Sequence, residues 1–264
     1  MKDALPQTIY LKDYKVPPFL IETTDLVFDL GEQQTCVTSS LAVRRNPASA
    51  EQSGSLELNS KGDVQLQWVE IDGQRLNDSD YTLSDNMLTL SNLPTSCVIT
   101  TEVRIQPQLN TSMMGLYRSR TMYCTQCEAE GFRRITYFPD RPDIMSIFTV
   151  KIVADKASYP ILLSNGNAIS RSDLEGGRHS ITWHDPFKKP SHLFALVAGT
   201  LAVVEDSFTT VSGREIPLQI FVEEKDLDKC AHAMLSLKKS MRWDEDVYGR
   251  EYDLDIFMIV AVDD

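Results

Sequence analysis

The chain has 264 residues, of which 42% are apolar and 24% are charged, a composition typical of a soluble globular protein. Its 38 acidic and 26 basic side chains give a net charge of −12 at pH 7, which repels phosphate backbones and argues against a nucleic-acid partner. The longest apolar run, Ile256 to Val262, is far shorter than the roughly 20 residues of a membrane-spanning helix, so no membrane partner is expected.

The N-terminal segment and the cysteines both favour a cytoplasmic location. Met1 to Leu20 carries charged residues and adjacent prolines, and it has no apolar core of signal-peptide length. Five cysteines are too few for a disulfide framework in a chain of this length, and their odd number suggests free thiols. In a cytoplasmic protein the glycosylation sequons at Asn77 and Asn110 are chance matches.

The first part of the chain predicts a series of short strands. Segments rich in β-branched residues alternate with turn signals such as Asp72-Gly73 and Asp85-Asn86. The expected strands are Val27–Leu30, Cys36–Val43, Leu56–Leu58, Val64–Ile71, Met87–Leu90 and Val98–Ile105.

The strand pattern resumes after residue 147, and its last two strands are expected to form a hairpin about Ser212-Gly213-Arg214. Short strands with regular turn signals are typical of a sandwich or an open β domain, so the predicted fold class is mainly β. The strands expected here are Phe148–Ala154, Ile161–Leu163, His179–Trp183, Leu193–Ala198, Ser207–Val211 and Ile216–Val222.

The pattern changes near Asp226. From Leu227 to Tyr248 apolar residues recur at helical spacing, with Asp226 as the expected N-cap and Gly249 just past the end. Leu254 to Val262 then reads as a buried strand. A long helix followed by an apolar strand does not continue the β module, so a second structural unit is expected to begin in this part of the chain.

The segment from Cys124 to Arg133 is the candidate functional site, because it gathers carboxylates, an amide and thiols within ten residues. Alternation along an extended segment points Gln126 and Glu128 to the same face. A carboxylate and an amide placed in this way can hold a small cation and line a pocket beside it. A rim of solvated polar residues is the alternative, and the pattern leaves both interpretations open.

Other chemistry finds little support in the sequence. Cys124 and Cys127 have the spacing of half a zinc site, but no second pair of close Cys or His ligands accompanies them. The four histidines are scattered, as packed or surface histidines are, and no His-Glu-x-x-His, Gly-x-Ser-x-Gly or phosphate-binding loop occurs. We therefore assign no catalytic residue and no metal ligand within the chain.

Several charged residues that follow the candidate site favour a structural role. An ion-pair and hydrogen-bond lattice that fixes the segment explains them better than a catalytic set. These residues are Arg133, Arg134, Asp140, Arg141 and Asp143.

The block Cys124-Thr-Gln-Cys-Glu-Ala-Glu-Gly-Phe-Arg133, with Ile135–Asp143 behind it, closely resembles the bacterial branch of the aminopeptidase N family, the zinc-dependent alanyl aminopeptidases. The likeness is dense from Thr111 to Asp264 and loose over the first 110 residues. Further matching blocks are Tyr159–Gly166, Asp185–Pro190, His192–Gly199, Ser212–Glu215 and Tyr252–Asp263.

The resemblance implies a saddle-like N-terminal β-sandwich domain over residues 1–199 and the start of a thermolysin-like α+β catalytic domain over residues 200–264. It also implies that Glu128 binds the free α-amino group of peptide substrates and that Gln126 lines the pocket for the first side chain. The partners expected on this basis are peptides with a free N-terminal amine.

The resemblance further implies a zinc cofactor in the full-length enzyme, with ligands that lie beyond Asp264. We expect the 264-residue chain alone to bind no zinc, to be inactive and to self-associate through an apolar patch at its C-terminal end. A non-catalytic β-rich binding module and a related epoxide-hydrolysing aminopeptidase are the alternatives.

Overall fold

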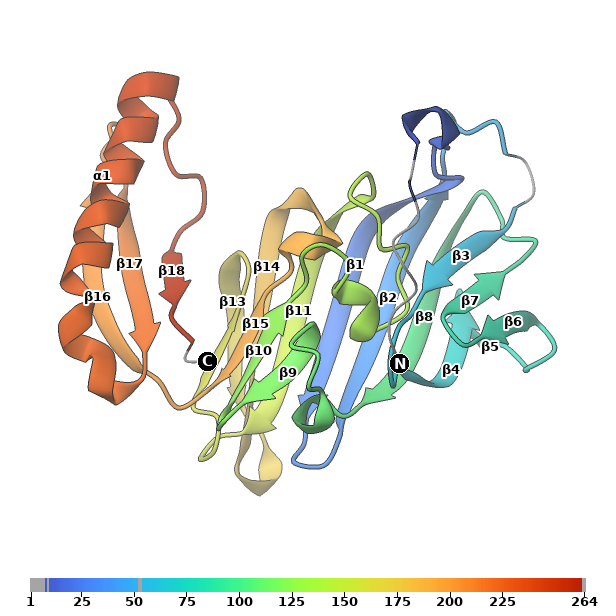
Figure 1. Cartoon of the computed structure of the whole chain (residues 1–264), viewed down its shortest axis with the longest axis horizontal. Coiled ribbons are helices and arrows are strands. Elements are labelled where there is room, and N and C mark those ends of the chain that lie inside the picture. Colours follow the sequence, from blue (N-terminus) through green and yellow to red (C-terminus); the bar gives the residue numbers. More distant parts are fainter. Residues whose placement is uncertain (1–7, 9, 52–53, 263–264) are drawn as a thin grey trace.

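The computed structural model describes residues 8, 10–51 and 54–262, and its centre is an eight-stranded sheet (Figure 1). The strand order is β13-β14-β11-β1-β2-β8-β4-β5. In this described sheet only β1 and β11 pair in parallel, and all other neighbours are antiparallel. Its strands are β1 (Phe19–Leu30), β2 (Thr35–Arg45), β4 (Gln65–Ile71), β5 (Gln74–Arg75), β8 (Ser96–Ile105), β11 (Met145–Asp155), β13 (Asn167–Asp173) and β14 (Arg178–Pro190).

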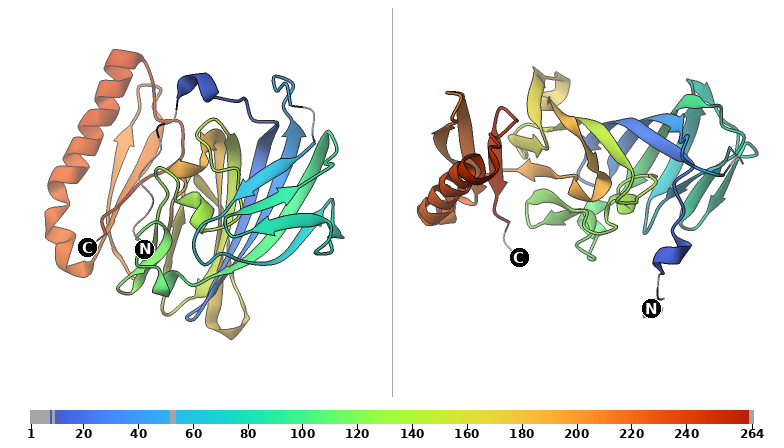
Figure 2. Two further views of the ribbon diagram at one scale, coloured as in Figure 1. Left: turned by 45° about the vertical axis from the view of Figure 1, so that its right-hand side comes forward. Right: turned by 90° about the horizontal axis from the view of Figure 1, so that it is seen from above.

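Alternation of side chains gives the large sheet one buried face and one solvent face. Along β1, Leu26 and Phe28 are buried, whereas Asp25 and Val27 are exposed. Two smaller sheets pack against the buried face and share its hydrophobic cluster (Figure 2). One contains β12 (Ile161–Ser164), β15 (Leu196–Gly199), β10 (Met122–Gln126) and β9 (Gly115–Ser119), and the other contains β3 (Leu56–Asn59), β7 (Met87–Leu90) and β6 (Tyr81–Ser84).

The C-terminal part of the described chain forms a second hydrophobic cluster. Here β16 (Ala202–Thr209), β17 (Glu215–Val222) and β18 (Phe257–Val260) form a three-stranded sheet beside the helix α1 (Ala231–Tyr248) (Figure 1). The predicted hairpin between β16 and β17 is confirmed, with Gly213 at a φ of 87°. The mainly β fold class is confirmed, whereas the boundary between residues 199 and 200 stays a prediction.

The helix begins later than the sequence predicts. Asp226 lies in a 3-10 helix (Glu224–Lys229) and pairs with Lys229, and α1 starts at Ala231 without a side-chain cap. The N-cap prediction is therefore wrong, because the carboxylate of Asp226 is used by the lysine one turn ahead. The predicted end is confirmed: Gly249 has a φ of 60°, and its N–H reaches the carbonyl oxygens of Asp244 and Glu245.

Two predicted strands differ in extent. In place of a strand over Leu193–Ala198, residues Ser191–Leu193 form a 3-10 helix and β15 starts at Leu196. The strand predicted over Leu254–Val262 shortens to β18, whose residues are half-buried because it lies at the edge of its sheet. The expectation of a fully buried strand is therefore wrong.

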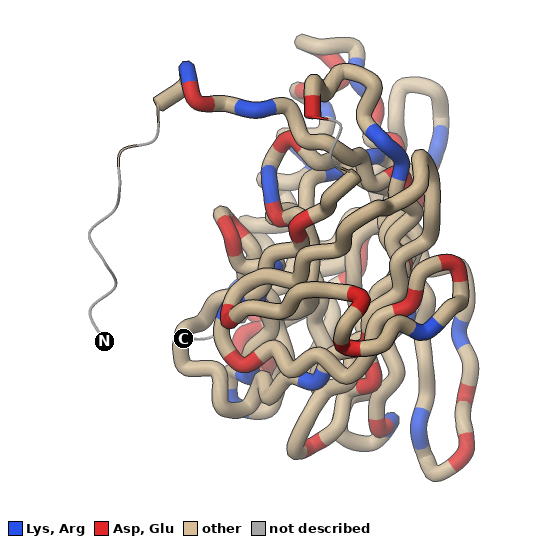
Figure 3. The backbone as a smooth tube through the Cα atoms, turned by 90° about the vertical axis from the view of Figure 1, so that its right-hand side faces the viewer, with Lys and Arg blue, Asp and Glu red and all other residues tan. Residues whose placement is uncertain are grey.

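Among the described residues, no helix has the length and apolar character needed to cross a membrane. Acidic and basic residues are interspersed along the backbone in the view of Figure 3. Residues 1–7 and 9 of the N-terminal segment, and the last residues Asp263 and Asp264, lie outside the described part of the chain.

Candidate functional site

The candidate site is a tight turn at the end of β10, residues 126–131, which we call the site turn. The strand ends at Gln126, the N–H of Gly131 donates to the carbonyl of Cys127 at 2.7 Å, and a 3-10 helix (Phe132–Arg134) follows. A Cβ at position 131 would collide with the carbonyl oxygen of Gln126 and lie 2.7 Å from the Cα of Cys127. The turn therefore requires glycine for reasons of space.

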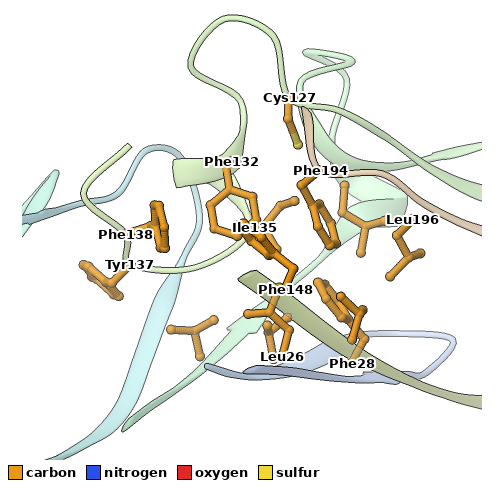
Figure 4. Close-up of a cluster of buried hydrophobic side chains, with 14 of the residues drawn as sticks. Leu26, Phe28, Cys127, Phe132, Ile135, Tyr137, Phe138, Phe148, Phe194 and Leu196 are labelled. Carbon is orange, nitrogen blue, oxygen red and sulfur yellow. The ribbon is translucent and has the colours of Figure 1, made fainter. Parts of the chain in front are cut away.

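An aromatic cluster supports the site turn from below (Figure 4). The ring of Phe132 meets Phe138 at 4.9 Å, Phe194 at 5.3 Å and Phe148 at 6.1 Å between centroids, each in an edge-to-face arrangement. Cys127 points into the same cluster and is buried. Edge-to-face contacts at this spacing stabilise the packing of the aromatic rings. The exposed side chains of the site turn are therefore attached to a well-packed part of the core.

Gln126 and Glu128 are both exposed, but they do not lie on one extended segment. The strand ends before Glu128, yet Cys127 between the two residues is buried, so their exposure follows the alternation that the sequence predicts. The turn still brings the two residues together, since Nε2 of Gln126 donates to the carbonyl oxygen of Glu128 at 3.3 Å. The Glu128 carboxylate has no hydrogen-bond or ion-pair partner among the described residues.

A buried carboxylate ties the far side of the turn to the rest of the domain. The side chain of Asp140 is 1% exposed, and its Oδ2 accepts hydrogen bonds from the backbone N–H of Arg133 at 3.1 Å and from Nε of Arg133 at 3.0 Å. Its Oδ1 accepts from Oγ of Ser191 at 2.5 Å. The charged lattice predicted for this segment is confirmed for Arg133 and Asp140.

The other residues of the predicted lattice agree with the prediction only in part. Arg141 and Asp143 form an ion pair of 2.6 Å, as expected. Arg134 makes no ion pair within the described residues and borders a small cavity with Lys61 and Asp63 instead. Glu130 lies 3.3 Å from Nη1 of Arg133, but its side chain is 68% exposed, and so exposed a pair contributes little to stability.

The cysteines of the motif are buried thiols. Burial raises the pKa of Cys127, with the nearby charge of Asp140 adding to the effect, and burial also raises the pKa of Cys124. Both therefore favour the protonated form, whereas zinc binds the thiolate. Among the described residues no three His, Cys, Asp or Glu side chains are grouped so that they could hold a metal ion.

The structure confirms for His179 that it is a packed histidine and not a ligand. Nε2 of His179 is 2.8 Å from the carbonyl oxygen of Tyr159 in the buried interior, which is the contact of a packed histidine. Sequence reasoning missed two residues that position the site. Thr125 accepts the N–H of Leu196 at 2.8 Å and holds β10 to β15, and Ser191 binds Asp140. An isolated hydroxyl gives no signal in the sequence.

The chain matches known proteins over nearly all of its length. It is 51% identical to Aminopeptidase N of Caulobacter vibrioides over 264 residues, which is 100% of the chain and 30% of that protein. The chain thus spans about 30% of the length of the curated relatives it matches. Most of the length of each relative therefore has no counterpart in this chain.

Solved structures give the same result. Aminopeptidase A of Legionella pneumophila, solved in complex with aspartic acid, superimposes with a TM-score of 0.91 at 34% identity over 96% of this chain and 30% of that one. A variant M1 zinc metallopeptidase of Deinococcus radiodurans, bound to a Tyr-Ser-Ala substrate, has a TM-score of 0.75 at 15% identity over 92% of this chain and 56% of that one, which shows the fold alone. The family model for the Peptidase M1 N-terminal domain matches residues 32–193. The chain therefore belongs to the Peptidase M1 N-terminal domain family.

Proposed function

We propose that this chain is the N-terminal part of a zinc-dependent aminopeptidase, in which Glu128 binds the free α-amino group of a peptide and Gln126 lines the pocket for its first side chain. The observation that carries the proposal is the carboxylate of Glu128, exposed and unpaired within the described residues, on a turn fixed by Gly131 and the aromatic cluster.

The chemistry of such a site follows from charge and position. An α-amino group has a pKa of about 8, so it is largely a cation at neutral pH. A carboxylate on a fixed turn stabilises that cation and so fixes the position of the peptide N-terminus in the site. An internal peptide bond presents no ammonium group to the carboxylate, so the same contact explains removal of residues from the N-terminus only.

Zinc would polarise the scissile carbonyl and activate a water molecule in this enzyme class. The residues described here do not fit a zinc site, since no three possible ligands among them are grouped. We therefore propose that the metal belongs to a part of the enzyme outside this chain. The names of the relatives support the proposal, because they are an Aminopeptidase N and an aminopeptidase A.

We also propose a cytoplasmic location. All five cysteines lie in the described part of the chain and are free, which fits a reducing compartment.

Replacement of Glu128 by Gln in the complete gene product tests the amine-binding role. The substitution keeps the shape of the side chain and removes its charge, so we expect a loss of about 2–4 kcal/mol in transition-state binding. This corresponds to a fall of roughly 30- to 1000-fold in kcat/KM on a dipeptide with a free amine.

Glu130→Gln is the matched control, because Glu130 lies in the same turn and pairs with Arg133 in solvent. We expect its kcat/KM to stay within about twofold of the wild type and its melting temperature to fall slightly, as for a surface ion pair. Wild-type kinetics in the Glu128→Gln enzyme would show that Glu128 is part of a solvated rim. Cleavage of an epoxide in place of a peptide would favour the epoxide-hydrolysing alternative.

A further inference from the structure

Arg133 is a cation close in sequence to Glu128, and all three nitrogens of its guanidinium group are engaged. Nε donates to Oδ2 of Asp140 at 3.0 Å, Nη2 donates to the carbonyl oxygen of Asp140 at 2.8 Å, and Nη1 lies 3.3 Å from Glu130. The guanidinium group is therefore directed toward Asp140, and the side chain of Arg133 is only 17% exposed. This orientation explains how an arginine five residues from Glu128 leaves that carboxylate unpaired.

Asp140 is held firmly enough to keep the arginine in this orientation. In addition to the bonds from Arg133, Oδ1 accepts from Ser191, and the backbone N–H of Asp140 donates to Oδ1 of Asn59 at 3.3 Å. These contacts connect the segment after the site turn to β3 and to the 3-10 helix that follows β14. A charge pair of which one member is fully buried is attracted more strongly than a pair in water, so the exposed carboxylate of Glu128 does not compete for Arg133.

We propose that Asp140 is a positioning residue, which sequesters the charge of Arg133 and so keeps Glu128 free for the substrate amine. This inference rests on the proposed amine-binding role of Glu128. Without Asp140, a guanidinium on the 3-10 helix directly after the site turn would reach a high effective concentration near Glu128 and would compete with the ammonium group of the substrate. Even without direct contact, an uncompensated positive charge beside the turn would repel that ammonium group.

The proposal predicts opposite results for the two members of one ion pair. In the complete gene product, Asp140→Asn removes the negative charge that neutralises Arg133 and leaves the hydrogen bond from Nη2 to the backbone carbonyl in place. KM for a free-amine dipeptide is expected to rise about five- to tenfold, with kcat per active site unchanged. Arg133→Gln removes the competing cation, so its KM is expected to stay at the wild-type value or below. The double variant Arg133→Gln/Asp140→Asn is expected to return KM to within about twofold of the wild type.

A purely structural role for the pair gives a different result. Either substitution would then displace the turn, both single variants would raise KM, and the double variant would not recover. That outcome would overturn the proposal. Since Arg133→Gln and the double variant carry the distinction, the test stands even if Asp140→Asn alone fails to fold.

Two further measurements separate the possible failures. The inhibition constant of an amino alcohol without a scissile bond should follow KM across the variants, because it reports amine binding alone. Asp143→Asn is the matched control, since it breaks the neighbouring pair with Arg141 by the same chemical change and should leave KM unaltered. A Glu128→Gln enzyme with a normal kcat/KM refutes the proposed function. A normal KM in Asp140→Asn, with Glu128→Gln impaired, refutes only the sequestering role.

Discussion

At the scale of single residues, glutamates of this chain serve two opposite purposes. Glu22 on β1 accepts a hydrogen bond from Lys188 at 2.5 Å and from Arg44 at 2.7 Å, and so ties β1 to β14 and β2. Hydrogen bonds from Lys188 first, and from Arg44 second, lower the pKa of the Glu22 carboxyl. Glu128 has no such partner in the described part of the chain, so its charge remains available to a ligand.

The tie through Glu22 predicts a dependence of stability on pH. Because the carboxyl pKa is lowered in the folded state, the stabilisation is complete above the ordinary value of 4.5 and is lost as pH falls through the folded-state value. Urea unfolding of the wild type and of Glu22→Gln should differ by less than about 1 kcal/mol at pH 7, since the side chain is partly exposed. The difference should shrink as the pH falls below 4.5 and through the lowered folded-state value.

Glu57→Gln is the control for Glu22, because Glu57 has no ion-pair partner within the described residues. We expect this variant to follow the wild type throughout the pH range. An equal difference between the wild type and Glu22→Gln at pH 7 and pH 3 would show that Glu22 acts through packing instead of charge.

At the scale of elements, the sequence predicts those strands whose side chains alternate clearly between buried and exposed. β1, β2 and β8 alternate clearly, and their existence could be predicted, although the observed β1 is longer than expected. β13 was missed because it is a polar edge strand whose exposed residues show no alternation. β9 and β10 were missed because each is short, and the turn between them contains Arg120 at a positive φ of 53°, which no turn residue announces.

The candidate site could be predicted in its residues but not in its shape. Gln126 and Glu128 were identified from their side-chain types, whereas the turn that joins them depends on tertiary contact. Gly131 lies against the backbone of Gln126 and of Gly115, and Gly115 belongs to a neighbouring strand. Periodicity carries no information about such a contact between segments, so the turn that follows Gln126 could not be predicted.

The tight approach at Gly131 predicts a stability difference between two glycines. Gly131→Ala forces a Cβ against backbone atoms that cannot move aside, so we expect unfolding free energy to fall by about 2–3 kcal/mol. Gly73→Ala is the comparison, because Gly73 has a φ of +77° and no atom within 4 Å of an added Cβ. Its cost should be roughly 1 kcal/mol, from backbone conformation alone. Urea unfolding measures both, and a smaller loss at Gly131 would mean that the turn relaxes.

At the scale of the whole molecule, the helix α1 carries several exposed apolar residues. The exposed fractions are 52% for Leu235, 52% for Trp243, 54% for Val247 and 63% for Tyr248, and the rings of Trp243 and Tyr248 meet edge to face at 5.1 Å. Scattered apolar residues are normal on a surface, but apolar residues gathered on one helix favour contact with another protein surface.

This surface predicts that the 264-residue chain self-associates in solution. Light scattering after size exclusion should give a mass that rises with concentration, because burying the apolar residues removes them from water. Substitution of Leu235 and Trp243 by Ser should shift the chain toward the monomer. Leu174→Ser, a similar change at a residue 40% exposed elsewhere, should not. A strictly monomeric wild-type chain at the highest attainable concentration would contradict the prediction.

The parallel pair at the centre of the large sheet has a consequence for synthesis on the ribosome. β1 finds its antiparallel partner β2 directly behind it, but its other edge pairs with β11, which begins only at Met145. While the intervening strands are translated, on the order of ten seconds passes with that edge of β1 unpaired. An open edge accepts strands from other chains, so the nascent protein is most prone to aggregation in this interval. Release of residues 145–155 from the exit tunnel closes the edge and ends the hazard.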